Sequence, residues 1–351
     1  MSKNCQLIGI TTVMHFLMDG LCMCCLFLLA MAYGDYWGAY GDRLILGAIL
    51  TYNVLAFMSQ PLTGLMADRM TQRHWLLLSS AVLLTVAVAM ASLPLKAEWL
   101  LILVAVGLGA GNSLFHVWGG KQTVVKMGND MRALGVFVST GALGLAIGAV
   151  FCSWMLLYGL LLAFVGMAIA YVRWDEADDT GGQAPLCSAS CAQDGASPRV
   201  SSASGRVSQS GDGSRVAAMT PVTVWTLVVG LMLFVGYRSF AGEVFSSGIT
   251  KSQSLVLIIG TVAMLGKMAG GWIARWMGIL KSLMVILAGV ALCFLFRSSL
   301  VWVLLLGIFL MNCTMPITLY LANLLLPKRE GLAFGLLAAA LIPGWLLATY
   351  L

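Results

Sequence analysis

The stretch Gly64-Leu65-Met66-Ala67-Asp68-Arg69-Met70-Thr71-Gln72-Arg73 separates two long apolar runs and is the most informative part of the chain. Its charged residues Asp68, Arg69 and Arg73 stand where a membrane-spanning helix would re-enter water. A short charged loop at a helix junction offers fixed charges to the ends of neighbouring helices. We therefore expect this loop, together with Gly64, to form a latch between two conformations.

The composition of the 351-residue chain excludes a soluble domain. Hydrophobic residues make up 60% of it and charged residues 10%, with a mean hydropathy of +0.94, so too little polar surface exists to cover a soluble core. Runs such as 76–88 and 301–311 are almost continuously apolar, whereas the strands of a membrane barrel alternate apolar and polar residues. The sequence therefore predicts an all-α polytopic membrane protein.

The apolar runs predict about eleven transmembrane helices, since a span needs roughly 20 mostly apolar residues. They lie near residues 6–31, 43–66, 75–94, 98–120, 132–150, 152–172, 221–242, 252–274, 280–297, 299–322 and 331–351. Between Trp174 and Thr220 the composition changes to Asp, Ser, Gly, Ala and Gln, which predicts a flexible linker over 174–220. The linker divides the chain into a six-helix bundle at 1–173 and a five-helix bundle at 221–351.

Basic residues predict the orientation. With the N-terminus in the cytoplasm, 14 basic residues fall in inside segments and 4 in outside segments. The inside set is Lys3, Arg69, Arg73, Lys121, Lys126, Arg132, Arg173, Arg199, Arg206, Arg215, Arg275, Lys281, Lys328 and Arg329; the outside set is Arg43, Lys96, Lys251 and Arg297. The linker is then cytoplasmic and the C-terminus lies on the opposite side. The net charge of +6 reflects this topology, and no nucleic-acid partner is expected.

Nothing in the sequence predicts a metal site, a cofactor or an enzyme. Most of the nine cysteines lie in apolar runs, and Cys187 and Cys191 form an isolated pair without a second pair or a nearby histidine. No nucleophile with a base and no phosphate-binding loop occurs in a supporting context. The chain is therefore not expected to be an enzyme or a self-contained ATP-driven pump.

A few ionisable residues fall inside the predicted spans, where a charge costs on the order of 3 kcal/mol and usually faces a cavity. They are His15, Asp19, His116, Arg238, Glu243 and Lys267. His15 and Asp19 are four residues apart, so they share one helical face and can share or pass a proton. We expect this pair to couple proton movement to conformational change. The alternative is a static tie between Asp19 and Arg238.

The remaining polar positions predict a substrate cavity. Arg238 suits an anionic substrate because its planar guanidinium binds carboxylate or phosphate, although an ion pair with Asp19 or Glu243 would also explain it. Glu243 fits an outer loop equally well. His116 is expected near the end of its helix, with a packing or gating role, and Asn312 fits a helix tie as well as a binding site. The predicted cavity residues are Tyr52, Asn53, Asn112, His116, Tyr237, Arg238, Glu243 and Asn312.

The charged loop resembles the signature between the second and third helices of the major facilitator superfamily. Gly64, Ala67, Asp68, Arg69 and Arg73 match it, while Thr71 and Gln72 stand where the family usually has Gly and Arg. The stretch 271–278 resembles a second copy after the eighth span. The resemblance implies a transporter with two six-helix halves, helices 1, 4, 7 and 10 bordering the cavity, and a twelfth helix that this chain lacks.

Several further segments resemble one branch of that family, the fosmidomycin-resistance type of proton-coupled exporter. They are His15-Phe16-Leu17-Met18-Asp19, Leu50-Thr51-Tyr52-Asn53, Gln60-Pro61-Leu62, Gly111-Asn112-Ser113-Leu114-Phe115-His116 and the glycine-rich stretch 326–335. After His116 the branch continues with Pro-Glu, whereas this chain has Val117-Trp118. The resemblance implies proton-coupled efflux of a small organic molecule across a bacterial inner membrane.

Other functions fit the same residues. The chain is either a shortened exporter, a proton-coupled uptake symporter, or a membrane sensor or assembly subunit that has kept the bundle and lost transport. Its expected partners are a small-molecule substrate, protons and the lipid bilayer, with another membrane subunit as one way to replace the missing helix.

Overall fold

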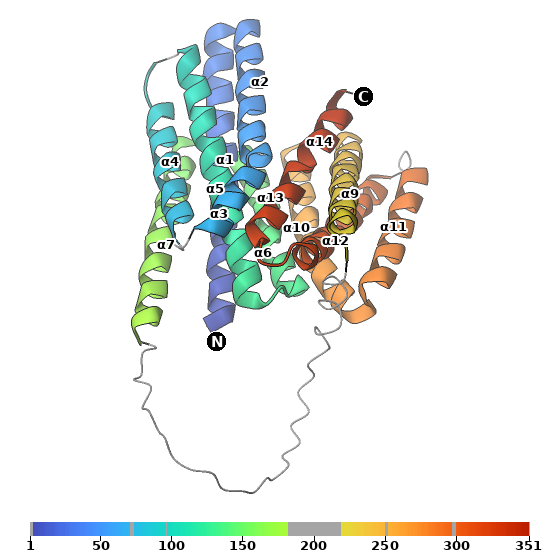
Figure 1. Ribbon diagram of the computed structural model, residues 1–351. Coiled ribbons are helices and arrows are strands. Elements are labelled where there is room, and N and C mark those ends of the chain that lie inside the picture. Colours follow the sequence, from blue (N-terminus) through green and yellow to red (C-terminus); the bar gives the residue numbers. More distant parts are fainter. Residues whose placement is uncertain are drawn as a thin grey trace, which may run out of the picture.

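The computed structural model of the chain describes residues 3–70, 74–95, 97–181, 219–249, 252–296 and 300–350, and every regular element among them is a helix. The first half holds α1 (Lys3–Trp37), α2 (Ala39–Asn53), the π-helical turn η1 (Val54–Met58), α3 (Gln60–Arg69), α4 (Trp75–Ala91), α5 (Glu98–Met127), α6 (Met131–Val150) and α7 (Trp154–Gly181). The second half holds α9 (Pro221–Ser247), α10 (Gln253–Met277), α11 (Ile279–Leu295), α12 (Val301–Leu325), α13 (Glu330–Ala339) and α14 (Leu341–Tyr350). Figure 1 shows the two halves as neighbouring bundles.

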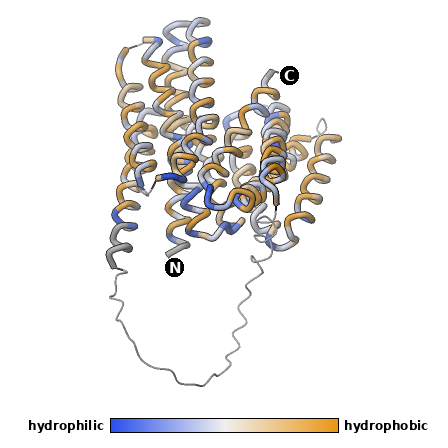
Figure 2. Tube along the Cα trace, viewed as in Figure 1, coloured by the Kyte–Doolittle hydropathy of each residue, from blue (hydrophilic) through white to orange (hydrophobic). Residues whose placement is uncertain are grey.

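The helices account for the predicted spans. Nine helical segments of the described chain are long and apolar enough to cross a bilayer, among them Ala39–Arg69, which joins α2, η1 and α3, and Glu330–Thr349, which joins α13 and α14. The two shorter apolar helices α4 and α11 complete the set of eleven. Figure 2 shows apolar residues along most of each helix. The predicted all-α polytopic membrane fold is thus confirmed.

Small residues allow the helices of the first half to approach closely. A Cβ atom on Gly144 of α6 would meet the carbonyl oxygen of Phe16 in α1, and one on Gly148 would meet that of Gly20. Helix backbones approach this closely only where side chains are absent. The polar face of α1 is therefore held firmly against α6.

The second span contains a local change of helical pitch. The π-helical turn η1 precedes α3, and Pro61 follows it without a backbone N–H to donate. Nearby side chains bond to carbonyls at this point: Ser59 Oγ donates to Leu55 O at 2.5 Å, and Gln60 Nε2 donates to Ala56 O at 2.7 Å. The irregular turn separates Tyr52 and Asn53, which precede it, from the loop signature that follows.

The two halves meet tightly at one end of the molecule. We call the end at which α3 finishes and α4 and α13 begin the linker side, and the opposite end the far side. There α3 packs on α13 so closely that a Cβ on Gly64 would meet the backbone of Gly331, and one on Gly335 would meet that of Gln60. On the far side, cavities of about 600 and 650 Å³ lie between the halves, reaching Ser246 and Gln253 in one and Ile49 and Trp345 in the other. The protein is closed on the linker side and hollow on the far side.

Candidate functional site: a charged cavity between the halves

A central cavity of about 300 Å³ lies between the two bundles. Polar and charged side chains from both halves line it together with apolar ones. The first half contributes His15, Asp19, Tyr52, Asn53, Gln60 and His116, and the second contributes Arg238, Lys267 and Thr318, among others. An apolar space with a few polar groups is how proteins hold small ligands.

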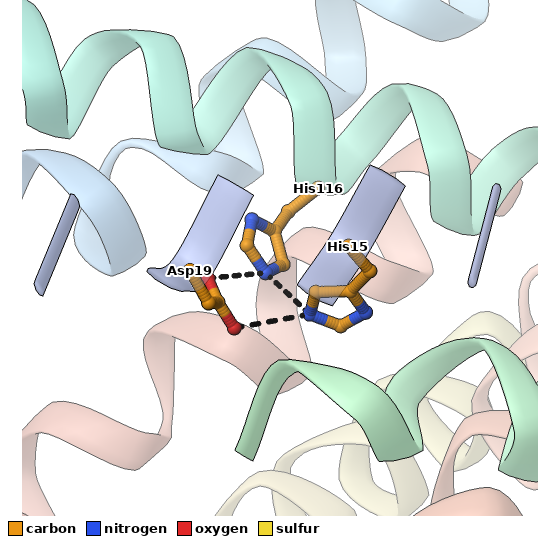
Figure 3. Close-up of side chains that lie close together, drawn as sticks. All are labelled: His15, Asp19 and His116. Carbon is orange, nitrogen blue, oxygen red and sulfur yellow. Dashed lines mark hydrogen bonds and ion pairs between the residues drawn. The ribbon is translucent and has the colours of Figure 1, made fainter. Parts of the chain in front are cut away.

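We call the side of the cavity formed by the first half the first wall, and the side formed by the second half the second wall. His15 lies on the first wall. Its Nδ1 lies 2.7 Å from the carbonyl oxygen of Phe137 in α6. Because a carbonyl only accepts hydrogen bonds, Nδ1 carries the proton in this contact and Nε2 of the neutral ring carries the lone pair. That Nε2 lies 3.3 Å from Asp19 Oδ2, so the predicted neighbours on α1 are in contact (Figure 3).

His116 of α5 completes the group. Its Nδ1 lies 2.9 Å from the carbonyl oxygen of Asn112, which again leaves a lone pair on Nε2 of the neutral ring. The Nε2 atoms of His116 and His15 face each other at 2.9 Å, and Asp19 Oδ1 lies 3.6 Å from His116 Nε2 (Figure 3). Two facing lone pairs repel, and a positive charge placed between the two rings would remove that repulsion.

The position of His116 differs from the sequence interpretation. The sequence suggested a packing or gating role near the end of a helix finishing at residue 120, but α5 continues to Met127. His116 therefore lies inside the bundle, buried and in contact with His15. The sequence does not indicate that the helix continues, because the polar residues Lys121, Thr123 and Lys126 follow the apolar run. In the structure these side chains bond to other groups of the protein.

Further contacts hold Asp19 in place. Asn112 Nδ2 donates to Asp19 Oδ1 at 3.2 Å and lies 3.2 Å from the Tyr52 hydroxyl. On the other side, Gly141 of α6 leaves room for the carboxylate, since a Cβ there would collide with Asp19 and His15. We call His15, Asp19 and His116 the triad.

The second wall carries two cations that have no carboxylate oxygen within 4.0 Å among the described residues. Arg238 of α9 is buried and donates to Thr318 Oγ1 at 3.4 Å. Within the described ranges, no carboxylate oxygen lies within 4.0 Å of Arg238 or Lys267. In particular, the alternative of a direct Asp19–Arg238 ion pair is not present in this conformation. Lys267, to which the sequence analysis gave no role, lines the same cavity.

The predicted cavity residues divide into two groups. Tyr52, Asn53, His116 and Arg238 line the cavity, and Asn112 contacts Asp19 just behind it. The other three do not line it. Tyr237 lies in an outer groove between α9 and α14, Asn312 donates to Ile308 O of its own helix at 2.8 Å, and Glu243 lies near the far end of α9.

The loop signature forms a contact between the halves on the linker side. Asp68 accepts hydrogen bonds from the backbone N–H groups of Gly331 and Leu332, both at 2.9 Å, at the start of α13. A carboxylate at a helix N-terminus is favoured by the helix dipole. Lys121 Nζ lies 3.3 Å from Asp68 Oδ1 and donates to Ala67 O at 2.7 Å. Arg69 is exposed, and Arg73 lies outside the described residues.

The family model of the Major Facilitator Superfamily matches residues 9–349. The fold is similar to that of the human organic anion transporter MFSD10 (TETRAN), with a TM-score of 0.65 and 15% identity over 99% of this chain and 93% of that one. It is also similar to a variant of the E. coli fucose:proton symporter FucP, with a TM-score of 0.59 and 14% identity over 99% of this chain and 91% of that one.

A further FucP structure, in the outward conformation, has a TM-score of 0.56 and 13% identity over 97% of this chain and 91% of that one. None of the curated proteins compared matches the chain significantly.

Proposed function

Because the chain belongs to the Major Facilitator Superfamily, a family of secondary transporters, we propose that it moves a small organic molecule by alternating access and that protons drive the movement. The observation that carries this proposal is the triad. Its two imidazole Nε2 atoms lie 2.9 Å apart beside the Asp19 carboxylate, inside a cavity shared by both halves. This arrangement accepts a positive charge readily, and a proton is the simplest one available in water.

The proton would be held by the triad as a whole. The neutral rings present two lone pairs to each other, and one proton placed between them converts repulsion into a hydrogen bond. Asp19 then balances the charge of the imidazolium. His116 thus joins His15 and Asp19 in the proposed coupling site. When the bundles rock, the cavity would face alternate sides and exchange the proton with each.

The second wall would bind the substrate. Arg238 and Lys267 lie in the cavity without a carboxylate partner in the described chain, so an anionic group is the natural ligand. Thr318, which also lines the cavity, accepts a hydrogen bond from the Arg238 guanidinium. Apolar side chains such as Phe57, Met315 and Phe334 would cover the remainder of the molecule.

The contact of Asp68 with α13 would close one side. Two backbone hydrogen bonds and Lys121 hold the first half against the second on the linker side. With the linker in the cytoplasm, as the distribution of basic residues predicts, the described conformation would be the one closed to the cytoplasm. The halves 1–173 and 221–351, joined by the cytoplasmic linker 174–220, would rock about the central cavity, and this contact would open during the movement.

The direction of transport in this proposal is efflux across a bacterial inner membrane. Its support is the resemblance of the segments around His15, Tyr52 and His116 to the exporter branch. An uptake symporter would use the same triad with the opposite coupling. Both differ from a non-transporting sensor, which would bind ligand without moving protons.

Proteoliposomes containing the purified chain test the proposal. A panel of small organic anions and drugs is applied with a proton gradient, and proton movement is followed by an internal pH dye. We expect a ligand-dependent proton flux that Asp19→Asn abolishes and that exposed Asp42→Asn leaves unchanged. Ligand-induced stabilisation without flux in the wild type would overturn the transporter proposal in favour of the sensor.

A further inference from the structure

We propose that His15, Asp19 and His116 also bind a divalent transition-metal ion, such as Zn²⁺, within the central cavity. These three are the group of described residues whose ligand atoms gather closely enough for one ion, since the atoms lie within 4.8 Å of one another. All three side chains are buried, and all three line the cavity. The inference concerns binding at equilibrium and does not depend on whether the chain transports.

The distances between the ligand atoms are close to those between neighbouring ligands of a tetrahedral metal ion. Zn²⁺ binds nitrogen and oxygen at about 2.0–2.1 Å, so two ligand atoms of a tetrahedral site lie about 3.3 Å apart. In the triad the separations are 2.9 Å between the two Nε2 atoms, 3.3 Å from His15 Nε2 to Asp19 Oδ2 and 3.6 Å from His116 Nε2 to Asp19 Oδ1. The two distances to Asp19 are to different carboxylate oxygens, so small side-chain adjustments would bring the two Nε2 atoms and one or both of these oxygens to an ion.

The surrounding hydrogen bonds orient these ligands. A histidine that binds a metal through Nε2 usually donates its Nδ1–H to a carbonyl or a carboxylate. Both rings do so, to Phe137 O at 2.7 Å and to Asn112 O at 2.9 Å. The Asn112 side chain donates to the Asp19 carboxylate at 3.2 Å. The lone pairs are therefore aimed at a common point before any ion arrives.

The donor set indicates the kind of ion. Two imidazoles with one carboxylate suit Zn²⁺, Co²⁺, Ni²⁺ or Cu²⁺, whereas Mg²⁺ and Ca²⁺ prefer sites made of oxygen alone. Three protein ligands leave a tetrahedral ion one open position, as in sites where metals meet substrates. Because the triad lines the cavity, that position is open to a ligand from the cavity.

The other charges of the cavity favour an anionic fourth ligand. Asp19 supplies one negative charge, while Arg238 and Lys267 share the cavity and oppose a second cation. An anionic fourth ligand, such as a carboxylate or a halide, would offset this repulsion by lying between the metal and the two cations. We therefore infer that metal and organic anion bind together, and that each strengthens the binding of the other.

Metal titration of the purified full chain tests this inference. The chain carries no polyhistidine tag and is titrated with Zn²⁺ by calorimetry and with Co²⁺ by absorption spectroscopy, with and without acetate. We expect one site with the spectrum of tetrahedral Co²⁺ bound by nitrogen and oxygen, and tighter binding in acetate. Sulfur ligation by the nine cysteines would give a different, charge-transfer band.

The three histidines of the chain supply a matched set of variants. His15→Gln and His116→Gln should each weaken binding by more than about 100-fold, since loss of an outer-shell partner alone costs 10–100-fold. His74→Gln should leave it unchanged, because His74 lies at the start of α4 beside Asp175, at 3.2 Å, and outside the cavity. Equal affinity in wild type and His116→Gln would overturn the proposal.

If a variant fails to fold, X-ray absorption at the zinc edge of the wild-type chain tests the metal site without any substitution. Two imidazoles and oxygen neighbours around one Zn²⁺ support the site, and a shell of sulfur or of water alone refutes it. A chain that binds metal but shows no proton flux would contradict the proposed transport function and leave the metal site intact.

Discussion

The two walls of the cavity satisfy their charges in opposite ways. On the first wall, Asp19 contacts His15, His116 and Asn112, and both rings are anchored to backbone carbonyls. On the second wall, Arg238 has the Thr318 hydroxyl at 3.4 Å and no carboxylate within the described residues. A network of connected hydrogen bonds can take up or release one positive charge, whereas a buried cation without a nearby carboxylate requires an anion from outside the protein. This difference supports the proposed division of roles, with ions on the first wall and substrate on the second.

The substitution that should disrupt the contacts of the first wall most is Gly141→Ala. The added Cβ would collide with the Asp19 carboxylate and the His15 ring, so the triad must come apart or α6 must move from α1. We expect proton flux to fall by more than about 100-fold and the free energy of unfolding to fall by about 1–3 kcal/mol.

Flux assays in proteoliposomes and thermal unfolding in detergent measure the two effects of Gly141→Ala. Gly159→Ala is the matched control, because a Cβ at Gly159 of α7 meets nothing within 4 Å. A Gly141→Ala protein with wild-type flux would show that the triad geometry is not needed for coupling.

The second wall is broken by Arg238→Met, which keeps an unbranched apolar chain and removes the charge. Charged hydrogen bonds contribute about 1.5–3 kcal/mol, so the affinity for an organic anion should fall about 10–150-fold. Lys267→Met should have a smaller effect because Lys267 is only half-buried. Ligand-induced thermal stabilisation measures both.

Arg43→Met, which replaces an exposed arginine, is the control for Arg238→Met. If anion affinity survives in Arg238→Met while Asp19→Asn loses it, the assignment of the two walls is reversed.

The sequence and the structure agree on what depends on local spacing. The eleven spans follow from the length of the apolar runs, and the contact of His15 with Asp19 follows from their spacing of four residues. The pairing of His116 with His15 joins α5 to α1 across 101 residues, and no pattern in one sequence indicates it. Contacts between helices have to be seen in three dimensions.

The sequence also does not show which face of an apolar helix lines the cavity. Tyr237 and Asn312 stand on nearly continuous apolar helices, where polar and apolar faces are hard to distinguish. Tyr237 faces an outer groove and Asn312 bonds to its own helix. The sequence identifies Lys121 only as a charge on the inside, whereas in the structure it is a partner of Asp68.

In the proposed transport cycle the contact between α3 and α13 opens, and Asp68→Asn weakens that contact. Asparagine keeps one acceptor oxygen but loses the charge that Lys121 and the start of α13 favour, so we expect a loss of about 1–2 kcal/mol. The population should shift about 5–30-fold toward the conformation that is open on the linker side.

Spin labels at exposed Met66 of α3 and at exposed Lys328, just before α13, measure this shift as a longer distance between the halves. Arg69→Gln is the comparison variant, because Arg69 is exposed in the described conformation although the sequence placed it in the latch. An equal shift in both variants would show that loop charge in general, and not the Asp68 contact, holds the linker side closed.

The smallest expected effect distinguishes a network from an isolated contact. Tyr52→Phe removes the hydroxyl that lies 3.2 Å from Asn112 Nδ2, but Asn112 keeps its bond to Asp19 and the triad keeps its own contacts. One neutral hydrogen bond contributes about 1 kcal/mol, so proton flux should fall by no more than about fivefold. Thr318→Val removes the hydroxyl that accepts a hydrogen bond from Arg238 on the second wall. No second hydrogen bond to Arg238 compensates among the described residues, so the affinity for an organic anion should fall by about fivefold or more. The two variants are compared by flux and by anion affinity in the same preparation. A collapse of flux in Tyr52→Phe, with Thr318→Val unaffected, would mean that the first wall depends on a single hydroxyl and that the contrast between a connected wall and an unpaired one does not hold.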